Sequence, residues 1–177
     1  MNRVSQCFFI AQFNLVIRLL LLLLFSVLST SLHAQITGKI IEENNYKGVL
    51  CPAEFKHSPQ DSVARWTPTE DEIRTLKHEL NNYLDKQPKN SIVNQKSTGP
   101  SIHKSLRKYI RQYTGYISPE GEKMIYLNCF WDEPENLFRK DYDRRLIQVF
   151  DGGSYYWQAH YNVQKHKFVF FSVNGVA

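Results

Sequence analysis

The sequence is poor in cysteine, and its longest uninterrupted apolar run is short. Its 177 residues include three cysteines, Cys7, Cys51 and Cys129, whereas a structural zinc site needs more Cys or His residues at close spacing. The main apolar run, residues 19–28, is far below the ~20 residues that cross a bilayer. The chain shows neither an internal repeat nor a low-complexity tract, and we expect no metal and no cofactor.

The first 34 residues have the pattern of a secretory signal peptide. Arg3 and Arg18 precede the apolar run, and small residues that end at Ala34 follow it. A basic region, a short apolar segment and a small-residue cleavage site are typical of export, with cleavage expected after Ala34. The sequence therefore predicts a secreted or periplasmic protein. The alternative is an uncleaved segment that anchors the protein, and only then do we expect membrane contact.

The remaining chain is mildly basic and has the size of one domain. The whole sequence holds 22 Lys and Arg against 17 Asp and Glu, and two of the basic residues belong to the predicted signal peptide. This excess does not indicate a nucleic-acid partner, which an exported protein seldom meets. In an oxidising compartment Cys51 and Cys129 can form one internal bridge, so we predict this disulfide. The alternative is two buried free thiols.

A helix begins at residues 67–70, after an irregular lead-in over residues 35–66 with a possible short strand at 36–41. Residues 67–70, Thr-Pro-Thr-Glu, have the pattern of a capping box with Pro68 at the first helical position, and the acidic residues Glu70, Asp71 and Glu72 lie at the positive end of the helix dipole. Apolar residues recur at three- and four-residue steps until Pro88. This stripe predicts a helix that packs one face against the core.

Strands are predicted after the helix. Aromatic and β-branched residues favour strands over residues 109–117, 123–130, 145–150, 155–162 and 167–173, joined by short turns. We interpret residues 67–177 as a single α+β domain, in which one helix packs on a four-stranded antiparallel meander sheet drawn from these five segments.

This order of a helix followed by four antiparallel strands resembles the cystatin-like folds over residues 67–173. Residues 151–157 together with 174–177 resemble small secreted bacterial proteins of uncharacterised function. Cystatins carry a Gln-x-Val-x-Gly hairpin tip, whereas residues 112–115 read Gln-Tyr-Thr-Gly, one residue short and without valine. The resemblance therefore implies a fold and no activity.

Strand alternation places aromatic side chains on the sheet face that the helix does not cover. This candidate binding face consists of Tyr126, Phe130, Tyr156, Phe168 and Phe170. It is open to a partner or a sugar ring unless residues 36–65 fold across it. We therefore predict a non-catalytic binding module for an unidentified protein or glycan.

Three other functions compete with this hypothesis. An exported hydrolase would use His160, Asp151 and Glu133, although no spacing brings them together. A carbohydrate-binding module would stack sugars on Trp131, and a protease inhibitor would present its turns.

Two charged stretches allow other interpretations of function. The basic residues His103, Lys104, Arg107, Lys108 and Arg111 form either a solvated face or a contact for an anionic glycan or membrane. The acidic residues between 132 and 143 allow calcium binding, but interspersed Lys and Arg favour local ion pairs.

Overall fold

The computed structural model describes residues 18, 36–43, 46–55, 63–91, 99–133 and 140–176. The predicted signal peptide and its cleavage site, apart from the helical Arg18, lie outside this part of the chain. Residues 36–177 form one compact unit and residues 1–35 another. Within the described ranges, no helix has the length and apolarity required to cross a bilayer.

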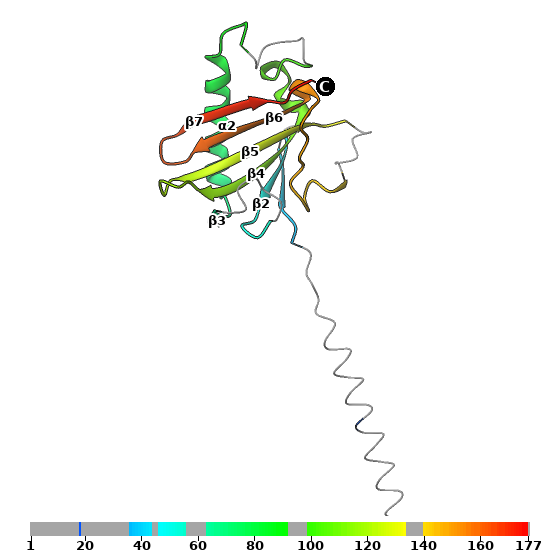
Figure 1. The fold of residues 1–177 in the computed structure, drawn as a ribbon, viewed down its shortest axis with the longest axis vertical. Coiled ribbons are helices and arrows are strands. Elements are labelled where there is room, and N and C mark those ends of the chain that lie inside the picture. Colours follow the sequence, from blue (N-terminus) through cyan, green and yellow to red (C-terminus); the bar gives the residue numbers. More distant parts are fainter. Residues whose placement is uncertain are drawn as a thin grey trace, which may run out of the picture. The chain divides into compact units, whose positions relative to one another are not determined.

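The larger unit is α+β, as predicted, with one α-helix and a mostly open sheet (Figure 1). The elements, in which η denotes a 3₁₀ helix, are β1 (Lys39–Glu43), β2 (Tyr46–Cys51), β3 (Arg65–Trp66), α2 (Glu70–Asp85), η1 (His103–Lys108), β4 (Tyr109–Ile117), β5 (Lys123–Trp131), η3 (Gly153–Tyr155), β6 (Tyr156–Asn162) and β7 (Lys167–Val173). The strands follow the order β1-β2-β4-β5-β6-β7, and β3 also pairs with β4. The sheet is thus larger than the predicted four-stranded meander.

The lead-in predicted over residues 35–66 is more regular than expected, because its described part supplies three strands, of which β1 overlaps the short strand expected at 36–41. β1 and β2 form an antiparallel hairpin, and β2 then pairs with β4 in parallel, with Val49 opposite Gln112. β3 pairs with the far end of β4, where Trp66 lies opposite Gly115. A β-carbon at Gly115 would lie 2.4 Å from the Trp66 carbonyl oxygen, so only glycine permits this close approach.

The predicted strand at residues 145–150 is also absent. β5 pairs directly with β6, and residues 140–150 cross one sheet face as turns and extended chain. We call residues 140–150 the strap. Two buried side chains, Gln112 and Asn128, hydrogen-bond its backbone. Side-chain amides therefore satisfy backbone groups that a strand would pair with its neighbour.

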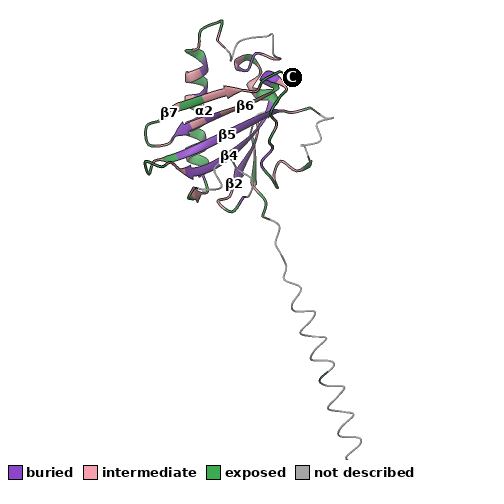
Figure 2. Cartoon of the chain, viewed as in Figure 1, coloured by how far each residue is buried: buried purple, intermediate pink, exposed green. Residues whose placement is uncertain are grey.

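The helix α2 confirms the predicted apolar face, but it begins two residues later than predicted, because Thr69 and not Thr67 is its N-cap. Thr69 and Glu72 form the reciprocal capping box, and the helix ends at Asp85, three residues before Pro88. Its buried side chains Ile73, Leu76, Leu80 and Leu84 pack against the sheet in a core that includes Tyr113, Leu127 and Trp157. Figure 1 shows α2 crossing behind the strands, and Figure 2 shows burial concentrated on β4 and β5.

The sheet face opposite α2 is also largely covered. Phe55 and Leu146 pack there with Met124 and Tyr126, and the strap residue Ile147 packs with Ile110 and Phe130. The central strands are therefore buried on both sides, although the described ranges place only one α-helix on the sheet.

Candidate functional site

The predicted Cys51–Cys129 disulfide does not form, and both cysteines are free thiols. Strand register explains why. Cys51 lies opposite Thr114 and shares its face with Tyr126, whereas Cys129 lies opposite Arg111 on the face that α2 covers. The sheet itself separates the two sulfurs. Burial raises the pKa of Cys51 to about 12 and raises the pKa of Cys129 well above its ordinary value.

The five aromatic residues predicted as a binding face do not form one open surface. Phe130 is 1 % exposed and Tyr126 is 8 % exposed, because the strap and Phe55 cover this region. Tyr156 is half-buried and packs on the cluster that contains Ile147. Sequence alternation correctly placed these three residues opposite the helix but could not show what covers them.

Phe168 lies on the other face, which corrects its predicted place. A β-bulge between His160 and Tyr161 shifts the register, so Phe170 pairs with His160 and Phe168 pairs with Tyr161. Phe168 consequently packs against Tyr83 of α2, with ring centroids 5.3 Å apart. Phe170 alone of the five is exposed, at 52 %.

His160 lies at the centre of an aromatic group rather than in a catalytic constellation. The Tyr116 hydroxyl lies 2.6 Å from His160 Nδ1, and the rings of Tyr126 and Phe170 contact the imidazole. Burial lowers the pKa of His160 and raises the pKa of Tyr116. Both shifts favour the uncharged forms of the imidazole and the phenol, which share the hydrogen bond between the Tyr116 hydroxyl and His160 Nδ1.

The structure does not bring together His160, Asp151 and Glu133. His160 pairs with Tyr126, whereas Glu133 lies beyond the end of β5, more than five strand residues or roughly 17 Å further along. Asp151 precedes η3, and its carbonyl accepts a hydrogen bond from Asn174 at the same distant end of the sheet. His160 therefore lies far along the sheet from both acidic residues considered for hydrolysis.

Trp131 is half-buried at the end of β5, where it meets two other rings. Its centroid lies 5.1 Å from that of Tyr109 and 5.4 Å from that of Tyr155, both in edge-to-face geometry. Tyr109 is buried, whereas Tyr155 is 40 % exposed. The residue proposed for sugar stacking thus lies beside a second accessible ring.

A basic groove with a volume of about 650 Å³ lies between α2 and η1. We call it the basic groove. Its lining residues are Lys77, Leu80, Asn81, His103, Lys104, Ser105, Leu106, Arg107, Lys108 and Arg111. It collects the whole basic stretch noted in the sequence and adds Lys77 and Asn81. These two residues border the apolar stripe of α2, but the sequence alone does not show that η1 faces them.

One structural bond holds the groove wall in place. The Arg111 guanidinium donates from Nη2 to the Leu106 carbonyl oxygen over 2.7 Å, which ties the end of η1 to β4. Arg111 is only 5 % exposed, whereas Lys104, Arg107 and Lys108 are exposed. The buried cation supports the wall, and the exposed ones present their charge to solvent.

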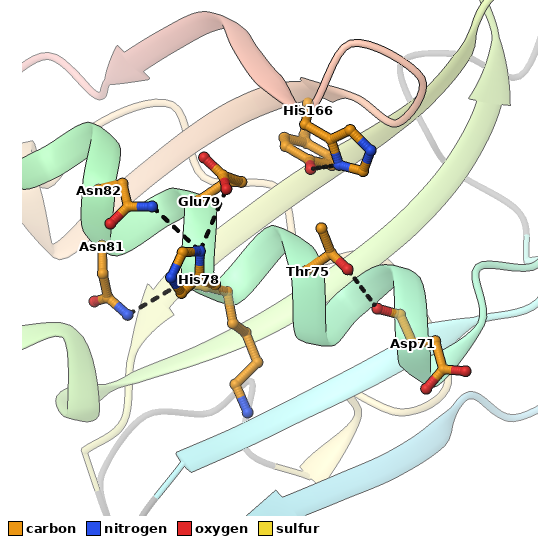
Figure 3. Close-up of polar contacts among 9 residues, drawn as sticks. Asp71, Thr75, His78, Glu79, Asn81, Asn82 and His166 are labelled. Carbon is orange, nitrogen blue, oxygen red and sulfur yellow. Dashed lines mark hydrogen bonds and ion pairs between the residues drawn. The ribbon is translucent and has the colours of Figure 1, made fainter.

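The groove keeps a single sign of charge. Of its described lining residues, none is acidic, and the adjoining Asp85 pairs with His103 over 2.9 Å at the end of α2. On the rest of the exposed surface of α2, polar side chains hydrogen-bond to neighbouring groups of the same helix (Figure 3). There His78 Nδ1 contacts both Glu79 and Asn82, and Thr75 donates to the Asp71 carbonyl, so polar groups satisfy one another locally.

The acidic residues after β5 form pairs with nearby cations. Asp132 contacts Lys47 over 2.9 Å, and Asp141 contacts Arg145 over 3.3 Å. Over the described ranges, no three His, Cys, Asp or Glu side chains gather as metal ligands would. Glu135 lies outside these ranges.

No family model, curated protein sequence or solved structure matches the chain. The resemblance to cystatin-like folds therefore stays a prediction, and the site must be interpreted from its own chemistry.

Proposed function

We propose that the protein is an exported, non-catalytic binding module that holds an anionic ligand in the basic groove. The observation that carries the proposal is the groove itself, where five Lys and Arg side chains and His103 line one concave surface. Like charges gathered in a concave surface reinforce one another and attract anions more strongly than the same charges spread out.

The export part of the proposal rests on the signal-peptide pattern of residues 1–34. The protein would then act in the periplasm or the medium, or at the membrane if this segment stays uncleaved. The non-catalytic part rests on the separation of His160 from Asp151 and Glu133. The proposed binding surface lies on the α2 side of the sheet, whereas the strap largely covers the aromatic face where the sequence predicted binding.

The test is binding of a simple polyanion, poly-L-glutamate, to the purified protein at low and moderate salt. The groove variant combines Lys104→Glu and Arg107→Glu, both at exposed positions. We expect its affinity to fall by about tenfold or more, which corresponds to about 1.4 kcal/mol. The affinity of the unchanged protein should also weaken as salt screens the charges.

A matched control combines Lys140→Glu and Lys167→Glu, which are exposed outside the groove and produce a comparable change of net charge. This control should bind within about twofold of the unchanged protein. Equal losses in both variants would show that only total charge matters, and the groove proposal would then be wrong.

A further inference from the structure

We infer that the ligand of the basic groove is an acidic polysaccharide, one of whose sugar rings packs on Trp131 and Tyr155. This inference rests on the proposed function and adds the chemical class of the ligand. It combines two features that were independent in the sequence, namely the cationic groove and the ring pair at the end of β5.

The ring pair lies directly beside the groove. Trp131 is the cross-strand partner of Tyr109, and Tyr109 follows the groove residue Lys108. The Asp132 backbone N–H also donates to the Lys108 carbonyl over 2.7 Å. Trp131 and Leu106 of η1 both pack against the core on the helix side of the sheet. One extended ligand can therefore reach the cations and the rings on a single face.

The rings are held in position before any ligand arrives. The Tyr109 hydroxyl donates to the Ser154 carbonyl, and the Ser154 hydroxyl donates to the Pro100 carbonyl, both over 2.7 Å. Gly99 lies so close to Tyr155 that an added β-carbon would come within 3.1 Å of its ring. A fixed aromatic surface loses little conformational entropy on binding, which favours affinity.

The chemistry beside the rings favours a sugar over a nucleotide. Aromatic faces carry partial negative charge and attract the C–H face of a sugar ring. Glu133 is exposed two residues after Trp131, and Asp132 holds an ion pair with Lys47 there. Carboxylates accept hydrogen bonds from the several hydroxyl groups of a sugar ring, in addition to the contacts of its C–H groups with the aromatic rings. The cations of the neighbouring basic groove are complementary in charge to the carboxylates of an acidic sugar chain.

The experiment compares three probes on the intact protein: polygalacturonate, poly-L-glutamate and a single-stranded oligothymidylate. The key variant is Tyr155→Ala, and the control is Phe150→Ala, at an aromatic residue that is 90 % exposed. We expect Tyr155→Ala to weaken polygalacturonate binding by about fivefold or more and to leave poly-L-glutamate binding unchanged. Phe150→Ala should leave both unchanged.

A spectroscopic readout reports the ring contact directly. Polygalacturonate should change the tryptophan fluorescence of the unchanged protein, and Trp131→Phe should abolish that change. Poly-L-glutamate should cause little change, because it carries carboxylates without sugar rings.

The outcomes separate the two proposals. If the groove variant loses both anionic polymers while Tyr155→Ala has no effect, the groove stands and the polysaccharide inference is overturned. Tighter binding of oligothymidylate than of polygalacturonate also overturns it, in favour of a nucleic acid. If the groove variant binds every probe normally, the proposed function fails as well.

Discussion

At the scale of single residues, the two cysteines of the described chain combine deep burial with separation by the sheet. Thiolate is the reactive form of cysteine, and burial raises the pKa of Cys51 to about 12. We expect neither Cys51 nor Cys129 to react with iodoacetamide in the native protein near neutral pH, and both to react in denaturant. Peptide mapping by mass spectrometry distinguishes the two sites. Recovery of a peptide pair linked through both sulfurs would contradict the structure.

His160 makes the stability of the fold depend on pH. Burial lowers its folded-state pKa below the ordinary value of 6.5, so the unfolded chain takes up the proton first as the pH falls. We therefore expect the free energy of unfolding to be fully retained above about pH 6.5 and to decline as the pH falls toward the folded-state pKa.

The measurement is urea denaturation at several pH values, with His160→Gln as the test variant. Glutamine keeps a hydrogen-bond acceptor for Tyr116 but does not titrate, so the decline should become shallower. His78→Gln, on the exposed surface of α2, serves as the control and should keep the slope of the unchanged protein. An identical slope in His160→Gln would refute this account.

At the scale of elements, the strap depends on the amide of Gln112. Its Nε2 donates to the carbonyl oxygens of Tyr142 and Arg145, each over 2.7 Å. Its Oε1 accepts from Asn128 Nδ2 and from the Ile147 N–H, each over 2.9 Å. Gln112 is 0 % exposed, so water cannot replace these bonds without opening the strap.

We expect Gln112→Met to lower the free energy of unfolding by about 2–4 kcal/mol, because it orphans several buried polar groups at nearly constant volume. Amide hydrogen exchange over residues 140–149 should accelerate in the same variant. Gln158→Met is the matched control, since Gln158 is only half-buried and donates a single bond to Asn174 over 3.0 Å. A larger effect from the control would show that the strap is held by its apolar contacts instead.

Local sequence signals predicted those elements whose interactions are local. The motif at residues 67–70 marked the start of α2 to within two residues, although the capping box that forms joins Thr69 to Glu72. The turn at residues 118–121 marked the β4–β5 hairpin. The β7 bulge was not predictable, because residues 168–171 are nearly all apolar and alternation has no polar reference there. The strap was mistaken for a strand because its inward residues, Leu146 and Ile147, are apolar as in a strand.

At the scale of the whole molecule, the missing information is long-range. Nothing within residues 46–51 indicates that their strand pairs with β4, more than 50 residues later. The basic groove has the same origin, because its walls are separated in sequence by residues 86–102 and meet only through packing. The basic stretch itself was visible, but its concavity and its neighbour Lys77 depend on the tertiary structure.

The parallel pairing of β2 with β4 also constrains the order in which the fold can assemble. The β1–β2 hairpin precedes the other described strands in synthesis. Among those strands its only partner in the rest of the sheet is β4, which follows α2 in the sequence. The β4–β5 and β6–β7 hairpins need only short loop closures, which are fast, whereas docking β2 closes a long loop. The β1–β2 hairpin can therefore join the sheet only after β4 has formed. A chain interrupted before β4 has no sheet edge with which this hairpin could pair.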